Sequence, residues 1–244
     1  MNGHLIIGSM LLCCSVSAAE VRVAVAANFT HTLTQLQTEF EKNTPHRVAI
    51  VSGATGKLFA QINNGAPFDV FLSADTEAPM RLVASGQAME QSEFTYARGR
   101  LVLWSAQSEA VQDAPRVLSV SKDRIALANP KHAPYGRAAE QTLRALQLWD
   151  KVTSRVVMGE NVNQTLQFAA TGNATWAFVG LAQVLDLPPQ QRGGYWAVPR
   201  DLYQSITQDA VLLVRGRDNP AAQEFITYLR GAAARKIIQR AGYE

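Results

Sequence analysis

The chain has almost no cysteine. Its two cysteines, Cys13 and Cys14, both lie in an apolar segment that ends in Ser-Ala-Ala at residues 17–19. An apolar run followed by small residues is typical of a secretory signal peptide, so we predict a signal peptide over residues 1–19, cleaved after about Ala19. The mature chain would then contain no cysteine, which excludes disulfides, thiolate metal sites and cysteine nucleophiles.

A lipid-anchored cysteine is the alternative interpretation of this segment. A lipoprotein peptidase prefers a small residue before the modified cysteine, whereas Leu12 precedes Cys13 and Cys13 precedes Cys14. The apolar run is also shorter than a membrane span. We therefore expect an exported chain that is released from the membrane.

Charge is sparse and evenly distributed. Charged residues make up 18% of the 244 residues and hydrophobic residues 47%, with a formal net charge of +3. Lysine and arginine are scattered rather than gathered into a run, which argues against nucleic acid as a partner. The length and composition favour a folded protein with one large core or two modest ones.

Enzyme signatures are also scarce. The segment Gly53-Ala54-Thr55-Gly56-Lys57 resembles a phosphate-binding P-loop, but it has two residues between its glycines where four are needed. Leu58 follows where a serine or threonine would hold magnesium. We therefore exclude a nucleotide site here and expect Lys57 to be a solvated charge.

Histidine and aspartate give no better evidence of catalysis. The four histidines are not spaced as metal ligands, so we expect surface or capping roles for them: His4, His31, His46 and His132. Asp69 and Asp75 are six residues apart on a strand-like segment, which separates them by roughly 20 Å. We predict that Asp69 is structural and that Asp75 caps a helix over residues 76–84.

Short apolar runs alternate with segments of helical periodicity along the whole chain. This alternation predicts an α/β fold with largely parallel sheets. The expected strands cover residues 21–27, 48–51, 69–73, 101–105, 125–128, 155–158, 176–179, 195–198 and 210–214.

Four of the junctions share one pattern, in which a strand ends in a small polar or glycine-containing loop that opens a helix. They span residues 21–30, 48–57, 125–137 and 156–163, and we predict helix caps at Thr30 or Asn28, at Thr55 and at Asn161. Such turns present unpaired backbone N–H groups at the positive end of a helix dipole, which suits an anion. Their neutral side chains add further donors: Asn28, Thr30, Ser52, Thr55, Tyr135, Asn161 and Asn163. We expect the four turns to converge in a cleft between two α/β domains.

Several segments together resemble the periplasmic molybdate-binding proteins of ABC transporters. They are residues 23–29, 53–62, 65–75, 129–136 and 160–162, with further similarity near the C-terminus. The resemblance implies a type II periplasmic-binding-protein fold, in which two α/β lobes are joined by two crossing hinge segments. We place lobe I at residues 20–100 and 204–244 and lobe II at 101–203, with hinges near Arg100 and Gln204.

The resemblance also implies a ligand site. The matching positions are Asn28, Thr55, Tyr135 and the backbone amide of Val162, and Thr30, Ser52 and Asn161 are possible additional contacts. Some members of the family supply a tyrosine hydroxyl at the strand end where this chain has Gly180. We predict that the phenol of Tyr135 replaces that donor.

The function implied is capture of molybdate, and of tungstate with it, for an ABC transporter permease and its ATPase in the periplasm. The metal would be bound only as the oxyanion, with no cofactor, and the protein would act as a monomer. Glu160 is expected to orient or cap rather than accept a ligand proton. The alternatives are another tetrahedral oxyanion such as sulfate, an exported enzyme that uses Asp75 or His132, and an anion-sensing module on the same fold.

Overall fold

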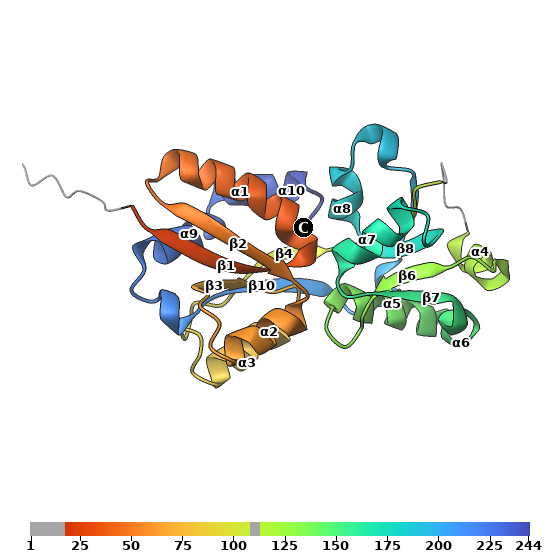
Figure 1. Ribbon diagram of the computed structural model, residues 1–244, viewed down its shortest axis with the longest axis horizontal. Helices are drawn as coiled ribbons and strands as arrows, with labels where there is room; N and C mark the ends of the chain where they lie inside the picture. Colours follow the sequence, from red (N-terminus) through yellow and green to blue (C-terminus); the bar gives the residue numbers. More distant parts are fainter. Residues whose placement is uncertain (1–17, 108–112) are drawn as a thin grey trace, which may run out of the picture.

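The protein consists of two α/β lobes that lie side by side along its longest axis (Figure 1). The computed structural model describes residues 18–107 and 113–244. Each lobe is built on a five-stranded sheet, and the two sheets have the orders β2-β1-β3-β10-β4 and β7-β6-β8-β5-β9. The prediction of a two-lobed α/β fold is confirmed.

The sheet of the first lobe has three parallel strands, β1, β2 and β3. Its other two strands, β4 and β10, directly precede the first crossing between the lobes and follow the second. Strand β1 pairs in parallel with β2 and β3, and β10 is antiparallel to both β3 and β4. The strand bounds are β1 Glu20–Ala26, β2 Arg47–Gly53, β3 Val70–Leu72, β4 Phe94–Gly99 and β10 Ile206–Leu212.

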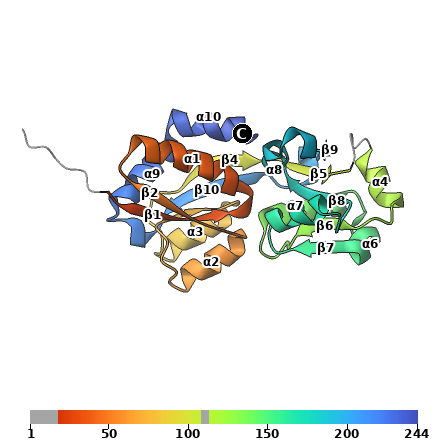
Figure 2. The ribbon, with the colours of Figure 1, turned by 45° about the horizontal axis from the view of Figure 1, so that its top comes forward.

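Helices cover both faces of this sheet because its inner strand β1 is apolar on both sides. Val21, Val23 and Val25 of β1 are packed in one core with α1, α9 and α10, whereas Ala24 is packed with α2 and α3. The helix bounds are α1 Thr30–Asn43, α2 Thr55–Asn63, α3 Glu77–Ala84, α9 Pro220–Arg230 and α10 Ala232–Arg240. Figure 2 shows α10 and α1 on one side of the sheet and α2 and α3 on the other.

The second lobe repeats the arrangement. Strand β6 is parallel to β7 and β8, and β5 is antiparallel to β8 and β9. Its strands are β5 Leu101–Ser105, β6 Ile125–Ala128, β7 Val156–Gly159, β8 Trp176–Gly180 and β9 Gly194–Ala197. Its helices are α4 Ala114–Val120, α5 Pro134–Ala145, α6 Trp149–Val152, α7 Val162–Ala170 and α8 Leu181–Asp186.

The chain passes from one sheet to the other twice. It crosses first at Arg100, between β4 and β5, and returns between β9 and β10. Arg100 and Gln204, where we place the hinges, lie in these two connections. Because parallel strands of each sheet lead into helices, α2, α5 and α7 begin at the junction between the lobes.

The helix starts agree with the sequence in part. Asn161 caps α7 as predicted, and Asp75 accepts a hydrogen bond from the N–H of Ala78 at 3.0 Å in the first turn of α3. The predicted caps Asn28 and Thr30 are wrong, because residues 27–29 form a 3₁₀ turn, η1, that leads directly into α1. Thr55 likewise is the first residue of α2 rather than the residue before it.

Asp69 is structural, as predicted. Its Oδ2 accepts a hydrogen bond from the N–H of Arg22 at 2.7 Å, which ties the start of β3 to β1. The predicted signal peptide and both cysteines fall almost wholly outside the described residues. Within residues 18–107 and 113–244, no helix is long and apolar enough to cross a membrane.

Candidate anion-binding site

A small cavity lies between the lobes where the four helix starts meet. The first lobe contributes Ala26, Ala27, Asn28, Gly53, Ala54, Thr55 and Ala74, and the second contributes Ala133, Pro134, Tyr135, Asn161 and Val162. The cavity volume, measured as the space open to the centre of a water-sized sphere, is about 10 Å³. The four oxygens of a tetrahedral ion have closely spaced centres, so a cavity of this size suits such an ion better than an organic ligand.

The cavity is lined by neutral groups. Among the described residues that line it, none has a charged side chain. Four helical segments begin here, namely η1, α2, α5 and α7, and the first N–H groups of a helix have no partner inside it. Figure 1 shows the ends of α1 and α7 at the junction of the lobes. The site therefore presents dipoles that favour negative charge.

The backbone N–H of Val162 is left free for a ligand by its own helix cap. The side-chain Oδ1 of Asn161 accepts from the N–H groups of Asn163 and Gln164 at 3.0 and 3.1 Å. Val162 is the first residue of α7, and it is the member of this first turn that the cap does not reach. Its N–H is thus available to an anion in the cavity.

Thr55 has its hydroxyl oriented by a neighbouring strand end. Its Oγ1 accepts a hydrogen bond from the N–H of Ala74 at 3.1 Å, and the residue is 2% exposed. A hydroxyl has one proton to donate and can accept as well. Because Ala74 occupies an acceptor position, the proton of Thr55 remains for the ligand.

Tyr135 lies in a space that two glycines leave open. A Cβ at Gly99 would come within 2.0 Å of the Tyr135 hydroxyl, and one at Gly180 within 3.1 Å of the ring. The residue is 2% exposed, and burial raises the pKa of its phenol well above the usual value. The phenol is therefore a neutral donor at any physiological pH. Tyr135 was predicted to replace the donor that is missing at Gly180, and its ring lies against Gly180 in the structure.

The side chain of Asn28, predicted to contact the ligand, is bonded within the protein instead. Its Nδ2 donates to Gln208 Oε1 at 2.9 Å and to the Tyr243 hydroxyl at 3.1 Å, so both amide hydrogens have partners within the protein. The residue lies in η1, at the start of the helical segment. Its backbone N–H belongs to the first turn of η1, where N–H groups have no partner inside the helix, and is the donor that remains for a ligand.

Thr30 and Ser52 lie outside the cavity. Their hydroxyl oxygens are 2.6 Å apart, and Thr30 Oγ1 also donates to the carbonyl of Ala27. Neither residue is among those that line the cavity. We therefore leave both out of the proposed site.

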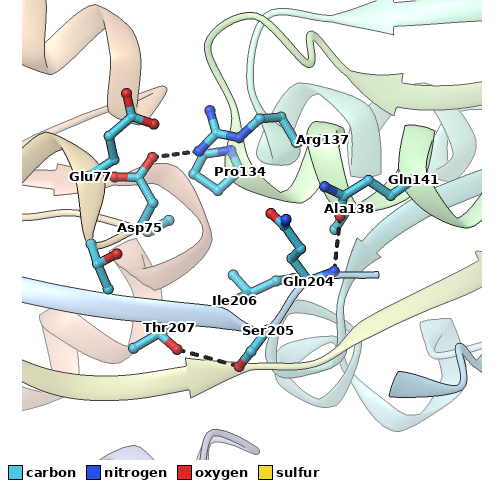
Figure 3. A pocket seen from close by; sticks show the side chains of 12 residues that line it. Asp75, Glu77, Pro134, Arg137, Ala138, Gln141, Gln204, Ser205, Ile206 and Thr207 are labelled. Atoms are coloured by element: carbon cyan, nitrogen blue, oxygen red, sulfur yellow. Dashed lines mark hydrogen bonds and ion pairs between the residues drawn. The ribbon is translucent and has the colours of Figure 1, made fainter. Parts of the chain in front are cut away.

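Ion pairs cross between the lobes around the cavity. Lys57 Nζ is 2.6 Å from Glu160 Oε1, and Arg137 Nη2 is 2.6 Å from Asp75 Oδ2. Figure 3 shows the second pair in a groove of about 240 Å³ that runs toward the hinge. A third pair joins His31 to Asp186 at 2.7 Å.

A backbone hydrogen bond also joins the lobes, from the N–H of Gly56 to the carbonyl of His132 at 2.9 Å. The lobes are thus closed over the cavity. Lys57 does not line the cavity and its side chain is 46% exposed, which agrees with a solvated charge rather than a ligand contact. Glu160 was expected to orient or cap; its carboxylate pairs with Lys57 across the cleft, and the cap of α7 is Asn161. The expectation of surface or capping histidines is wrong for His46, which is 1% exposed.

Sequence reasoning missed a group of polar residues behind the cavity. Gln208, Tyr96 and Tyr243 are buried and hydrogen-bonded to one another or to Asn28. They come from β10, β4 and the C-terminal tail, which are far from residue 28 in the sequence. The one available signal was the polar stretch Thr207, Gln208 and Asp209 within β10.

Two closed α/β lobes around a small, uncharged, donor-lined cavity define a bilobal solute-binding protein. The chain belongs to the family of bacterial extracellular solute-binding proteins, whose sequence pattern matches residues 21–244. Within residues 18–107 and 113–244, no cluster of three or more histidine, aspartate or glutamate side chains could hold a metal ion.

Individual relatives cover nearly the whole chain. It is 48% identical to the molybdate-binding protein ModA of Azotobacter vinelandii, over 97% of this chain and 94% of that protein. It is 42% identical to ModA of Rhodobacter capsulatus, over 93% of this chain and 89% of that protein. The solved structure of the Azotobacter vinelandii periplasmic molybdate-binding protein superimposes with a TM-score of 0.87 at 41% identity, covering 92% of this chain and 98% of that one.

Proposed function

We propose that this chain captures molybdate in the cavity between its lobes, in the manner of the ModA proteins that it resembles, and delivers it to an ABC importer. The observation that carries the proposal is the neutral cavity at four helix starts, where the Asn161 cap leaves the N–H of Val162 free and Thr55 Oγ1 already accepts from Ala74. The proposed contacts are the backbone N–H of Asn28, the hydroxyls of Thr55 and Tyr135, and the backbone N–H of Val162.

A dianion can be held without lysine or arginine if its oxygens are saturated with hydrogen bonds. Removing such an ion from water is costly, and each unsatisfied oxygen would add to that cost. Hydrogen bonds to a charged group contribute about 1.5–3 kcal/mol each, so several donors can offset the desolvation. Molybdate is fully deprotonated at neutral pH and needs only donors, which matches this cavity.

Selectivity is proposed to depend on the size of the ion. A shell of donors spaced for molybdate or tungstate would leave some of them short of the smaller sulfate ion, and unpaired buried donors cost free energy. Protonated phosphate needs an acceptor as well. Glu160 and Asp75, the carboxylates next in the chain to lining residues, are paired with Lys57 and Arg137.

We test the proposal by calorimetric titration of the mature protein with molybdate, tungstate, sulfate and phosphate. We expect tight binding of molybdate and tungstate at one site and weak binding of the other two. Sulfate binding as tight as molybdate binding would refute the assignment and favour a general oxyanion carrier.

The rest of the proposal concerns partners and place. We propose that the protein acts in the periplasm after removal of a signal peptide, as a monomer without a cofactor. Its closed form would dock on a permease driven by an ATPase. The lobes close because the ligand contacts both of them, and a ligand shifts such an equilibrium only by its differential affinity for the two states. We propose binding without turnover, which assays of the protein with molybdate would check by unchanged recovery of the ion.

A further inference from the structure

Behind the cavity lies a buried group of amides and phenols that connects the two lobes. We call it the amide–phenol cluster and define it as Asn28, Tyr96, Tyr135, Gln208 and Tyr243. All five residues are less than 9% exposed, and Gln208 is fully buried. Four of them belong to the first lobe, and Tyr135 belongs to the second.

Gln208 is the centre of this cluster. Its Oε1 accepts from Asn28 Nδ2 at 2.9 Å and from the Tyr96 hydroxyl at 3.1 Å. Its Nε2 donates to the hydroxyl of Tyr135 at 3.5 Å, across the junction of the lobes. One side-chain amide therefore contacts two proposed ligand-site residues, one from each lobe.

A local irregularity of the sheet brings Tyr96 to this amide. Gln208 is paired with Ala97 and Asp209 with Thr95, so Tyr96 is an extra residue of β4 without an opposite partner. Bulges of this kind redirect side chains and occur often beside functional sites. Here the bulge places the Tyr96 hydroxyl against Gln208 Oε1.

The amide orientations of Asn28 and Gln208 in the structure set the direction of the hydrogen bonds in the cluster. The single proton of the Tyr96 hydroxyl has two acceptors, the carbonyl of Ser73 at 3.0 Å and Gln208 Oε1 at 3.1 Å. The Tyr243 hydroxyl donates to the carbonyl of Asn28 at 2.7 Å, so its oxygen is left to accept from Asn28 Nδ2. Asn28 donates to Gln208, whose oxygen faces Asn28 and whose amide nitrogen faces Tyr135. The Tyr135 oxygen consequently accepts from Gln208, and its single proton is free to point into the cavity.

We propose that Gln208 is a positioning residue that fixes the direction of the Tyr135 hydroxyl. Through its bonds to Asn28 and Tyr135 it connects the ligand contacts of the first lobe with those of the second. The inference rests on the proposed function. Gln208 does not line the cavity and acts through Asn28 and Tyr135. It explains why an amide, with an acceptor at one end and a donor at the other, occupies a fully buried position in β10.

The decisive variant is Gln208→Glu, because a carboxylate keeps the shape of the amide and reverses one hydrogen bond. An ionised carboxylate accepts only, so the Tyr135 proton would turn away from the cavity toward it. We expect molybdate affinity at about pH 8 to fall at least about tenfold, the equivalent of one lost charge-assisted hydrogen bond. Protonation of the new carboxyl restores a donor, so affinity should partly recover as pH is lowered to about 6.

The matched control is Gln239→Glu, the same change at an exposed position of α10. It and the wild type should show the same affinity at both pH values. The three phenols of the cluster stay protonated between pH 6 and pH 8, because burial raises the pKa of each of them. The other ionisable side chains nearby are Tyr203, Asp75 and Asp209.

A second variant decides the question if Gln208→Glu does not fold. Gln208→Met should lower affinity in the wild-type background and have a smaller effect in a Tyr135→Phe background, because the two residues act together. Equal effects in both backgrounds, or a folded Gln208→Glu variant whose affinity shows no recovery at the lower pH, would overturn the inference. Wild-type protein that binds no oxyanion would overturn the proposed function and the inference together, whereas binding that is unaffected at position 208 overturns the inference alone.

Discussion

The ring of Tyr135 lies against Gly180, so close that a Cβ at position 180 would be 3.1 Å from Tyr135 Cε1 and 3.3 Å from Cζ. The backbone of Gly180, with φ −76° and ψ 140°, is one that any residue can adopt. The absence of a side chain at this position is therefore explained by the tyrosine and not by the backbone. The Tyr135 ring fills the space that a side chain at position 180 would occupy.

The first prediction follows from this contact. Gly180→Ala should leave the protein folded but displace the Tyr135 ring by a few tenths of an ångström, and we expect molybdate affinity to fall several-fold because hydrogen bonds weaken with misalignment. Calorimetry measures the loss. In a Tyr135→Phe background the same change should cost much less, and an equal loss in both backgrounds would show that the ring position is irrelevant.

The second prediction concerns the phenol itself. Tyr135→Phe removes one donor to a dianion and leaves Gln208 Nε2 without its acceptor, so we expect affinity to fall by about 10-fold or more, or about 1.5–3 kcal/mol. Tyr195→Phe is the matched control, since that tyrosine is 41% exposed on β9. Unchanged affinity of the Tyr135 variant would contradict its role as the replacement donor.

The third prediction separates the hydroxyl of Thr55 from its volume. Thr55→Ser keeps the donor and the acceptor for the N–H of Ala74, so its affinity should stay near that of the wild type. Thr55→Val keeps the shape but loses the donor and leaves a buried N–H unpaired, which costs about 1–3 kcal/mol. We expect this variant to lose both affinity and thermal stability; similar affinities for the two variants would rule out a ligand contact from the hydroxyl.

The fourth prediction tests whether positive charge holds the ion. Lys57 and Glu160 are 46% and 54% exposed, and exposed ion pairs contribute little. Lys57→Met, alone or with Glu160→Gln, should therefore change affinity at most about fivefold. A loss of several hundred-fold in Lys57→Met would mean that the lysine binds the anion directly, contrary to the proposed site.

The fifth prediction is a flat pH profile for the wild type. The cavity has no charged side chain among its described lining residues, and burial raises the pKa of the Tyr135 phenol well above its usual value. The donor form is the protonated one, which persists below that raised pKa and is lost only at higher pH. Calorimetric affinities should therefore be constant between roughly pH 6.5 and pH 9; a decline within this range would implicate a titrating group in the site.

Local features of the site could be predicted from the sequence. The strand-to-helix turns and the cap at Asn161 depend on residues within a few positions of one another, and the structure confirms both. The cap predictions at Asn28 and Thr55 were wrong because residues 27–29 form a 3₁₀ turn and α2 begins one residue early. Helix ends are decided by packing as well as by the local sequence, so such errors arise at boundaries.

The sequence by itself determined the α/β alternation, the neutral character of the loops and the cap of α7, because periodicity and capping are short-range. Only the tertiary structure decided which donors are free. Asn28 is engaged by Gln208 and Tyr243, residues 180 and 215 positions away, and Tyr135 fits because Gly99 and Gly180 leave room for it. Each donor proton is used by one acceptor, and the acceptor that is present depends on contacts between segments that are distant in the chain.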